Sequence, residues 1–413
     1  MSEERAHLIV GGGVIGLCCG YFLSRAGHRV VVIDRDEAGH ESCSDRNSGM
    51  VVPSHFTPLA APGVVSQGLK WMLNPRSPFY LRPRLDAKLW AWCWQFLRHS
   101  NRRHVANSRE LLRDLSLESR ALFEELSITL DFPMVKKGLL MLCQTEEGLG
   151  EESEVARMAN EIGIKAEVCE PKRLAELEPG VKMKAKGGVW YEQDCHLDSE
   201  QFLAALRKGI EHHGGIFRGG EVVNFRFGGQ TVTHVTDSVG NEIEVSGVTL
   251  AGGAWSPCLA SRLGLNLPVQ GGKGYSFTLT KPHELPQLCY LLKEGRVAVT
   301  PTGRRLRVAG TMEICGDDLS VDQVRLSGII DSFCQVFPAY AFDDFEGLKA
   351  WSGLRPCSPD GLPYVGAVER YRNVTVATGH AMLGLSLGPV TGRLIRDLVA
   401  GQAADVRLDP ERF

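Results

Sequence analysis

The sequence predicts an α/β fold that contains a discontinuous Rossmann-like domain and a second α+β domain built on an antiparallel or mixed sheet. Three observations predict it. A strand, a glycine loop, a helix and a second strand follow one another within residues 7–35. A second strand, glycine turn and helix occupy residues 374–401, and short β-type segments separated by turn residues lie between, at residues 275–310. The chain thus ends on the kind of unit with which it begins.

The N-terminal unit has its parts in the order that a nucleotide-binding βαβ unit requires. Residues 8–10 are a short apolar run typical of a buried strand, and residues 11–16 form a G-x-G-x-x-G loop. A helical pattern then runs over residues 14–26 and is closed by Gly27, before a second apolar strand at residues 30–33. This context distinguishes the motif from a simple glycine-rich turn.

Each glycine of the loop has a separate physical role. Gly11 allows a tight turn out of the strand, Gly13 lets a pyrophosphate approach the backbone, and Gly16 lets the helix pack closely on the sheet. The helix N-terminus offers N–H groups and a partial positive charge to phosphates. Asp34, 18 residues after Gly16, can accept hydrogen bonds from ribose hydroxyls. The sequence therefore predicts dinucleotide binding but leaves the dinucleotide open.

Composition excludes several classes of protein. The 413 residues are 43% hydrophobic and 23% charged, as in ordinary globular proteins, and the net charge of −3 gives no reason to expect nucleic acid as a partner. The 12 cysteines form no C-x-x-C pair or Cys/His cluster, so we expect reduced thiols and no metal site. We find no signal peptide and no apolar run near the ~18 residues of a membrane span, and we expect a cytoplasmic protein.

A tryptophan-rich segment at residues 85–99 predicts a helix with an apolar face. At helical spacing, one face carries Leu89, Trp90, Cys93, Trp94 and Leu97. The first interpretation is that this face packs on the core below the second domain. The alternative is a surface for a partner, or for peripheral contact with the inner face of the membrane, because tryptophan beside arginine suits an interface.

The remaining elements follow from local patterns. Asp198, with Gln201 three residues later, is a helix-capping signal, and Pro389 suits the first turn of the last helix. The polar loop at residues 42–50 is either a second phosphate or ribose contact or a solvated connection. Further helices are expected at residues 110–126, 151–162, 199–213, 320–336 and 389–400. Further strands are expected at residues 139–143, 189–191, 221–227, 230–237, 242–250, 275–279, 297–300, 305–310 and 374–378.

Four blocks carry a resemblance to a known family. They are the N-terminal loop with residues 47–49, residues 251–256, residues 273–276, and a tail block at residues 351–361 and 378–380. In these blocks the chain resembles the FAD-dependent D-amino acid dehydrogenases, within the larger family that includes glycine oxidase and sarcosine oxidase. Residues 61–63 and 70–72 resemble the dehydrogenase branch specifically.

The resemblance implies non-covalent FAD and a division of the chain. The FAD-binding domain would comprise residues 1–60, 198–267 and 355–413, and the substrate domain residues 61–197 and 268–354. The helix opened by Pro389 would point its positive end at the N1/C2 edge of the flavin. The implied cofactor-binding residues are Gly11, Gly13, Val14, Ile15, Gly16, Asp34, Arg35, Ser48, Gly49, Val222, Gly252, Trp255, Gly379, Gly384 and Leu385.

For the substrate, the resemblance assigns Arg355 to an amino acid carboxylate, which a guanidinium fork binds with two hydrogen bonds. Tyr275 is a second candidate for the carboxylate or the amine, against simple core packing. His380 is a candidate for the flavin or the substrate, against a histidine satisfied inside its loop, and His55 is a further candidate. Two departures concern the tail: residues 381–387 are more apolar than in the dehydrogenase branch, and Cys357 does not align with the covalent flavin attachment of sarcosine oxidases.

The expected reaction is oxidation of a D-amino acid, or of a cyclic D-imino acid such as a D-proline or hydroxyproline derivative. The Cα hydride would pass to flavin N5, and the imine would hydrolyse to a 2-oxo acid and ammonia, or persist as a cyclic imine. The electron acceptor would be a quinone or an electron-transfer chain. The alternatives are an oxygen-using oxidase of the glycine or sarcosine type, an NAD-dependent dehydrogenase, and a flavoprotein without turnover.

Overall fold

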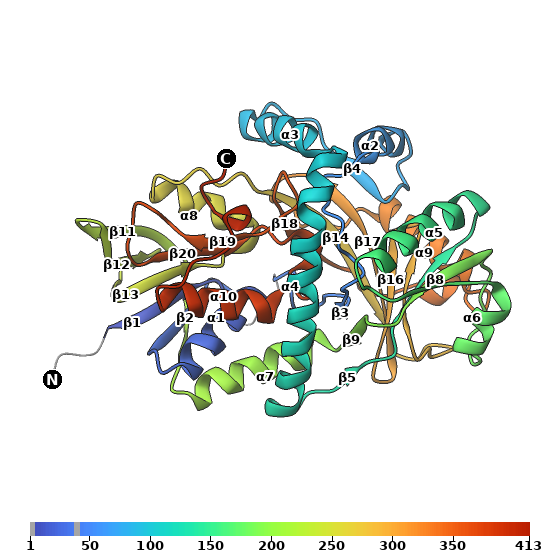
Figure 1. Cartoon of the computed structure of the whole chain (residues 1–413), viewed down its shortest axis with the longest axis horizontal. Coiled ribbons are helices and arrows are strands. Elements are labelled where there is room, and N and C mark those ends of the chain that lie inside the picture. The colour runs from blue at the N-terminus through green and yellow to red at the C-terminus, as the bar shows by residue number, and fades with distance from the viewer. Residues whose placement is uncertain (1–4, 37–41) are drawn as a thin grey trace.

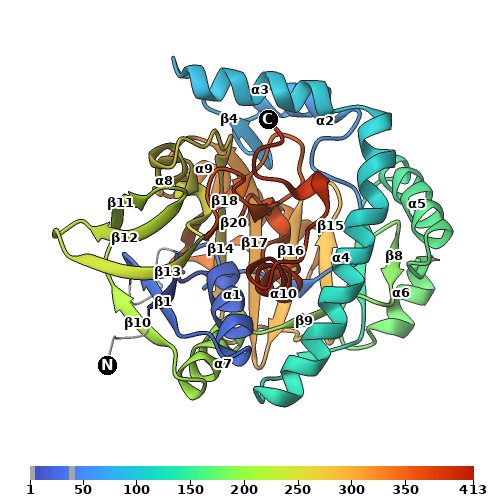
Figure 2. The ribbon, with the colours of Figure 1, turned by 60° about the vertical axis from the view of Figure 1, so that its left-hand side comes forward.

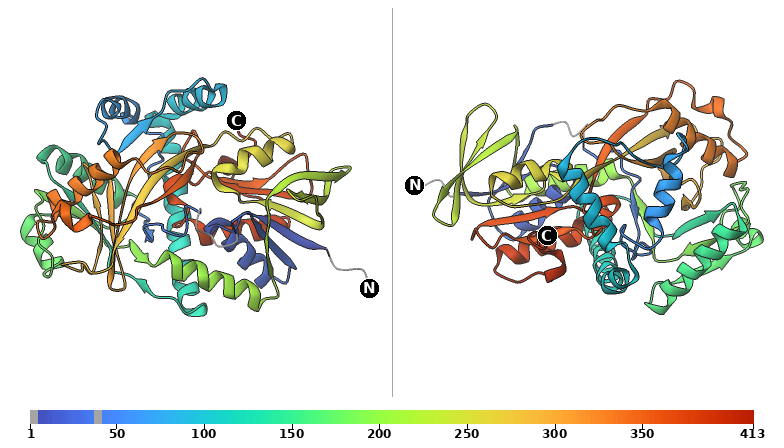
Figure 3. Two further views of the ribbon diagram at one scale, coloured as in Figure 1. Left: turned by 180° about the vertical axis from the view of Figure 1, so that it is seen from behind. Right: turned by 90° about the horizontal axis from the view of Figure 1, so that it is seen from above.

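The computed structural model describes residues 5–36 and 42–413, and its elements are arranged around two large sheets (Figures 1 and 2). One sheet has eight strands and the other has nine, with helices packed on both, so the predicted α/β fold class is confirmed. Seen from behind, the blue N-terminal strands and the orange strands of the second sheet lie on opposite sides of the molecule (Figure 3).

The first sheet has a parallel centre built from both ends of the chain. Its parallel strands lie in the order β10-β2-β1-β13-β20, with β19 antiparallel to β20 and the β11–β12 hairpin extending from β13. Buried valine and isoleucine fill β1 and β2, as expected for strands covered on both faces. The strands are β1 (Ala6–Val10), β2 (Val30–Asp34), β10 (Ile216–Gly219), β11 (Val222–Gly228), β12 (Thr231–Asp237), β13 (Glu242–Leu250), β19 (Tyr364–Ala367) and β20 (Val374–Thr378).

Three helices, α1 (Val14–Arg25), α7 (Ser199–His212) and α10 (Gly388–Val399), form a layer beside this sheet, with α1 in contact with both others. Asp198 caps α7 through the N–H of Glu200, and Pro389 lies in the first turn of α10, as predicted. At Gly392 a side chain would stand 2.6 Å from the backbone of Cys18, so the N-terminal and C-terminal helices touch backbone to backbone. The short helices η1 (Gly253–Trp255) and α8 (Ser256–Arg262) follow β13.

The second sheet is mixed and lies in the order β18-β14-β17-β16-β15-β6-β8-β7, with β4 beside β17. A phenylalanine- and tyrosine-rich core separates it from α9 (Gln323–Val336), while α5 (Glu146–Glu161) and α6 (Pro171–Leu177) pack on its other end. The strands are β4 (Phe79–Leu81), β6 (Leu139–Cys143), β7 (Ala166–Cys169), β8 (Gly187–Tyr191), β14 (Gln270–Leu279), β15 (Cys289–Leu292), β16 (Val297–Thr302), β17 (Arg305–Ile314) and β18 (Trp351–Cys357).

A small third sheet and three further helices complete the structure. The strands of this sheet are β3 (Met50–Val51), β9 (Cys195–Leu197) and β5 (Met134–Val135). The long helix α4 (Arg102–Thr129) packs on α10, while α2 (Val64–Met72) and α3 (Ala87–His99) lie together at the top of Figure 1. The remaining short helices are η2 (Phe342–Phe345), η3 (Ala381–Leu383) and η4 (Val406–Leu408).

The helix predicted at residues 85–99 is present as α3, but its predicted core-facing side is wrong. Trp90 and Trp94 are 54% and 60% exposed, and Leu97 is also exposed. The buried residues are Leu89 and Trp92, because the Trp92 indole donates a hydrogen bond to the carbonyl of Cys357 (2.9 Å) and so fixes that face inward. A hydrogen-bonding anchor, which helical spacing does not reveal, decides the orientation.

The proposed division of the chain into an FAD-binding and a substrate domain stays a prediction. The predicted boundary between residues 354 and 355 falls within β18, and the whole of this strand pairs with β14 of the second sheet. Among the helices of residues 5–36 and 42–413, none combines the length and the apolar composition that crossing a membrane requires.

Candidate active site

A cavity of about 1800 Å³ runs from the carboxyl ends of β1 and β2 to the second sheet. It is lined by polar and apolar side chains from both sheets and from the tail that precedes α10. Its walls include 15 of the 18 residues predicted for the site: Gly11, Gly13, Val14, Ile15, Asp34, Arg35, Ser48, Val222, Gly252, Trp255, Tyr275, Arg355, His380, Gly384 and Leu385. The fold thus brings segments that are far apart in sequence to one space.

The first end of the cavity is made largely of backbone. Gly11 has φ +113°, and a side chain there would stand 2.4 Å from the carbonyl oxygen of Ala251 on the neighbouring strand. Gly13 keeps the surface open beside Ser44, whose hydroxyl accepts a hydrogen bond from the N–H of Val14 at 2.9 Å. The predicted loop at residues 42–50 therefore reaches the N-terminus of α1, where a phosphate would bind.

Acidic and aromatic side chains complete this end. The Asp34 carboxylate accepts hydrogen bonds from the N–H groups of Gly12 and Asp36, and it faces the cavity at the end of β2. The Arg35 guanidinium stacks over the Trp255 ring, 4.1 Å from its centre. This cation–π contact joins two predicted cofactor residues from different elements.

Three predicted glycines do not line the cavity, and each has a packing reason for being glycine. A side chain at Gly16 would stand 1.8 Å from the carbonyl oxygen of Gly11. At Gly49, with φ +71°, it would stand 2.0 Å from the carbonyl oxygen of Leu197, and at Gly379, with φ +78°, 2.6 Å from the Tyr364 ring. Packing excludes a side chain at each of these positions, and their assignment to direct cofactor contact stays a prediction.

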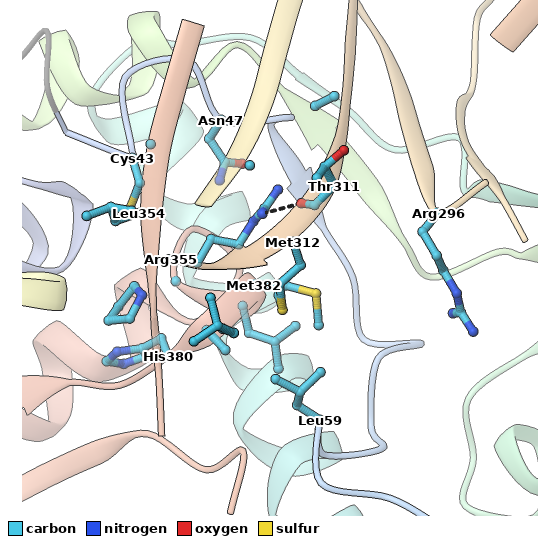
Figure 4. A pocket seen from close by; sticks show the side chains of 18 of the residues that line it. Cys43, Asn47, Leu59, Arg296, Thr311, Met312, Leu354, Arg355, His380 and Met382 are labelled. Carbon is cyan, nitrogen blue, oxygen red and sulfur yellow. Dashed lines mark hydrogen bonds between the residues drawn. The ribbon is translucent and has the colours of Figure 1, made fainter. Parts of the chain in front are cut away.

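At the other end, Arg355 extends from β18 into the cavity (Figure 4). Its Nη1 donates to the carbonyl oxygen of Thr311 at 2.8 Å, and the guanidinium lies over Gly274, where a side chain would stand only 2.2 Å from Nη1. Within residues 5–36 and 42–413, Arg355 forms no ion pair. Burial lowers the pKa of its guanidinium, which nevertheless stays charged because arginine does not deprotonate in proteins. The site therefore holds a partly desolvated cation that lacks a carboxylate.

Apolar side chains surround this cation. Leu59, Met312 and Met382 project into the space beside Arg355 in Figure 4, and all three line the cavity. An apolar wall weakens solvent screening and strengthens the attraction between the guanidinium and a bound anion. The sequence indicated the apolar character of residues 381–387, but it did not identify Thr311 or Leu59.

His380 is buried in the turn that follows β20. Its Nε2 lies 2.9 Å from the Thr391 hydroxyl of α10, while its Nδ1 is buried and has no hydrogen-bond partner in the described part of the chain. Burial lowers the pKa of His380 to about 3, so the ring is neutral at physiological pH. One nitrogen is satisfied by a side chain of α10 rather than inside the loop, and the other is available to a ligand.

Tyr275 is placed differently from the prediction that it contacts substrate. Its hydroxyl donates to the Glu313 carboxylate and accepts from the N–H of Asp322 at 3.1 Å. Glu313 in turn lies 3.8 Å from Lys273 and 3.8 Å from Arg325 in the buried interior. This arrangement favours core packing, with the hydroxyl committed to a structural network.

The walls at both ends fit a bound flavin dinucleotide. Gly11 and Gly13 form a cradle that a side chain would fill, Asp34 stands where a ribose would lie, and His380 offers an orphaned buried nitrogen at the opposite end. A Rossmann sheet with a cavity of this kind at its carboxyl edge defines a dinucleotide-dependent enzyme.

Comparison with known proteins identifies the class. Residues 7–398 match the family described as FAD dependent oxidoreductase, so the chain belongs to this family and is an FAD-dependent enzyme. A protein named D-amino acid dehydrogenase from Granulibacter bethesdensis is 32% identical over 97% of this chain and 96% of its own. A protein of the same name from Methylobacterium radiotolerans is 33% identical over 97% of each. The NAD-dependent alternative is thereby replaced by FAD.

Solved structures share the fold. The glycine oxidase from Geobacillus kaustophilus has a TM-score of 0.78 and 25% identity, with 99% of each chain covered. The L-proline dehydrogenase from P. horikoshii has a TM-score of 0.75 and 17% identity, covering 100% of this chain and 98% of its own. The predicted resemblance to this group of flavoenzymes is confirmed.

Proposed function

We propose that this protein oxidises a D-amino acid to an imine that hydrolyses to a 2-oxo acid and ammonia, or oxidises a cyclic D-imino acid such as a proline or hydroxyproline derivative to a cyclic imine that keeps its nitrogen. The observation that carries this proposal is the Arg355 guanidinium, which faces the cavity without an ion pair in the described structure. A desolvated cation of this kind is costly unless a ligand supplies the anion. The relatives named D-amino acid dehydrogenase support the choice of substrate.

In this proposal, when FAD is bound it accepts the hydride from the substrate Cα. Arg355 binds the carboxylate with its free N–H groups, since Nη1 already donates one hydrogen bond to Thr311. Fixing the carboxylate orients Cα, and orientation of this kind lowers the barrier. The apolar side chains of Leu59, Met312 and Met382 exclude water and disfavour the charged ammonium, so the amine can react in its neutral form.

The cofactor would be held without a covalent bond. Gly11, Gly13 and the N-terminus of α1 would hold the pyrophosphate, and Asp34 the adenosine ribose. Cys357 is buried, and it is not among the residues that line the cavity. Denaturation should therefore release FAD into the supernatant.

The decisive experiment is anaerobic bleaching of the flavin by a panel of D-amino acids, glycine, sarcosine and hydroxyproline isomers, with wild type and Arg355→Met. We expect bleaching by D-isomers and a KM raised roughly 30- to 5000-fold in the variant, because losing one partner of a desolvated charge pair costs about 2–5 kcal/mol. Flavin content should stay that of wild type. Unchanged kinetics in Arg355→Met would remove Arg355 from the site.

The likeness to glycine oxidase favours a second candidate, an oxidase that uses oxygen directly. We propose the dehydrogenase because the relatives with the higher identity carry that name. Reduced enzyme mixed with air or with a quinone separates the two, since a dehydrogenase is reoxidised faster by the quinone.

We also propose that the outer face of α3 contacts a membrane surface near the quinone acceptor. Trp90, Trp94 and Leu97 form an exposed apolar strip, and Lys88 and Arg98 on the same helix are exposed. Aromatic and basic side chains on one helix suit the interface of an anionic bilayer.

Co-sedimentation with vesicles of anionic lipid tests this surface. Replacing Trp90 and Trp94 together by Ala should weaken binding roughly tenfold or more, because each large apolar side chain contributes about 1.5–3 kcal/mol on burial. Ile128→Ala, which changes an 83% exposed residue on α4, is the matched control. Equal binding by wild type and the double variant would refute the membrane proposal.

A further inference from the structure

The segment that follows β3 is held firmly at the cavity wall. The N–H of Val52 donates to the hydroxyl of Ser386, in the tail that leads into α10, at 3.0 Å. Two residues on, Ser54 donates to both carboxylate oxygens of Asp194, through its N–H at 3.0 Å and its hydroxyl at 2.5 Å. His55, the next residue, is thereby fixed against the cavity that it lines.

The hydrogen-bond chain determines how the His55 ring is presented. Its Nδ1 lies 3.1 Å from the Ser54 hydroxyl oxygen. That hydroxyl has one hydrogen, and it points to Asp194 when the carboxylate is ionised, so Ser54 must accept and His55 Nδ1 must carry the donated hydrogen. Nε2 then has a lone pair, and the hydrogen bond that the His55 ring makes within residues 5–36 and 42–413 is through Nδ1. Ser54 and Asp194 thus keep His55 Nε2 in the form of a neutral hydrogen-bond acceptor.

We propose that His55 is the recognition residue for the substrate amino group: its Nε2 accepts a hydrogen bond from the amine while Arg355 holds the carboxylate. This inference rests on the proposed function and deepens it. Two points of attachment on different elements, the loop after β3 and strand β18, would fix the Cα between them. An amine that gives its hydrogen to a neutral nitrogen keeps its lone pair free to form the imine.

The arrangement also predicts a pH dependence. Burial raises the pKa of Asp194 to about 7, against the hydrogen bonds from Ser54 and the charge of Arg120. Once protonated, Asp194 can donate to Ser54, which then donates to His55 Nδ1 and leaves a hydrogen on Nε2. Binding of the amine should therefore weaken as the pH falls through about 7.

His55 itself stays neutral over this range. Burial lowers its pKa to about 4; the charge of Glu152 acts in the opposite direction, and that of Arg296 in the same direction. Glu152 is paired with Lys293 at 2.9 Å, which moderates its effect. The tautomer of His55, rather than its charge, is therefore the quantity that Asp194 controls.

The test compares amino acids with the carboxylates that lack the amino group, using D-alanine with propanoate and D-proline with cyclopentanecarboxylate. In the holoenzyme, His55→Leu should raise KM for the amino acids tenfold or more and leave the Kd of the carboxylates, measured from the flavin spectrum, within twofold. His55→Gln keeps an acceptor and should recover most of the affinity. Arg355→Met should weaken both ligands of each pair.

Two outcomes would overturn the inference: equal effects of His55→Leu on both ligands of a pair, or no effect on either. If wild type binds neither ligand of each pair, the proposed function itself fails, and the two failures are thus distinguishable. Asp194→Asn should mimic the protonated carboxyl, with raised KM and no further rise below pH 7. If His55→Leu does not fold, Ser54→Ala can be compared with wild type on the same pairs of ligands. A pH profile of KM in Asp194→Asn and Ser54→Ala equal to that of wild type would exclude control of His55 by the Asp194–Ser54 hydrogen bonds.

Discussion

The two ends of the cavity are built from different materials. At the end formed by β1, β2 and α1, the surface is backbone, and the residues that matter are those without side chains, such as Gly11 and Gly13. At the end formed by β17 and β18, the surface is side chain, with Arg355 against the carbonyl of Thr311. In the proposed function, the first end would recognise a shape common to many dinucleotides, and the second would recognise charge. Substitutions should therefore lower FAD affinity at the first end and raise the KM for the amino acid at the second.

Among the substitutions that keep the Arg355 charge, the largest effect is expected at the backbone end. Gly13 has an extended conformation that valine can adopt, so Gly13→Val fills the cradle without straining the chain. We expect FAD affinity to fall roughly 5- to 150-fold, from an overpacking cost of about 1–3 kcal/mol. Absorbance of the bound flavin after gel filtration measures it. Gly150→Ala, at a glycine with open space around it, is the control, and full flavin in Gly13→Val would contradict the cradle.

A smaller effect is expected at the side-chain end when the charge is kept. Arg355→Lys preserves the cation but loses the fork that binds a carboxylate at two points. KM for the amino acid should rise roughly tenfold, consistent with about 1–1.5 kcal/mol for a hydrogen bond. Bound flavin should be unchanged, as in wild type. A lysine variant as poor as Arg355→Met would mean that geometry, rather than charge, dominates this end.

The smallest effect on activity is expected at Tyr275, which borders the same end but directs its hydroxyl into the core. Tyr275→Phe removes hydrogen bonds to Glu313 and Asp322, and we expect a loss of about 1–3 kcal/mol in the free energy of unfolding. KM should stay within roughly twofold of wild type. Denaturant titration and steady-state kinetics measure the two quantities, and the opposite pattern would place Tyr275 at the substrate.

The contrast also explains what the sequence could predict. The backbone end was predictable because a tight turn and a close approach each demand glycine at a fixed position, as with Gly11 and Gly13. At the other end, Thr311 and Gly274 come to Arg355 only through the pairing of β14 with β17 and β18, which local patterns do not encode. The orientation of α3 was missed for a related reason, because the Trp92 anchor bonds to a residue 265 positions away.

Glycine is also ambiguous as a signal. Gly49 and Gly379 are cofactor residues by the resemblance and have positive φ in the structure, yet the atoms nearest to an added side chain belong to Leu197 and Tyr364. Sequence shows that a side chain is excluded, but only the fold shows what excludes it. The family resemblance assigned both glycines to the cofactor, but it does not distinguish a residue that contacts the cofactor from one that packs behind the cavity wall.

The contact between α1 and α10 has a consequence for synthesis of the chain. Strand β1 pairs with β13, β13 pairs with β20, and Gly392 of α10 rests on Cys18 of α1. The first sheet and the helix layer on it are therefore complete only after residue 399 has left the ribosome, roughly 20–80 s after β1 at about 5–20 residues per second. The second sheet, whose last strand β18 ends at Cys357, has all its strands before β20 and α10 of the first half are made, so the half that starts first is the last to be completed.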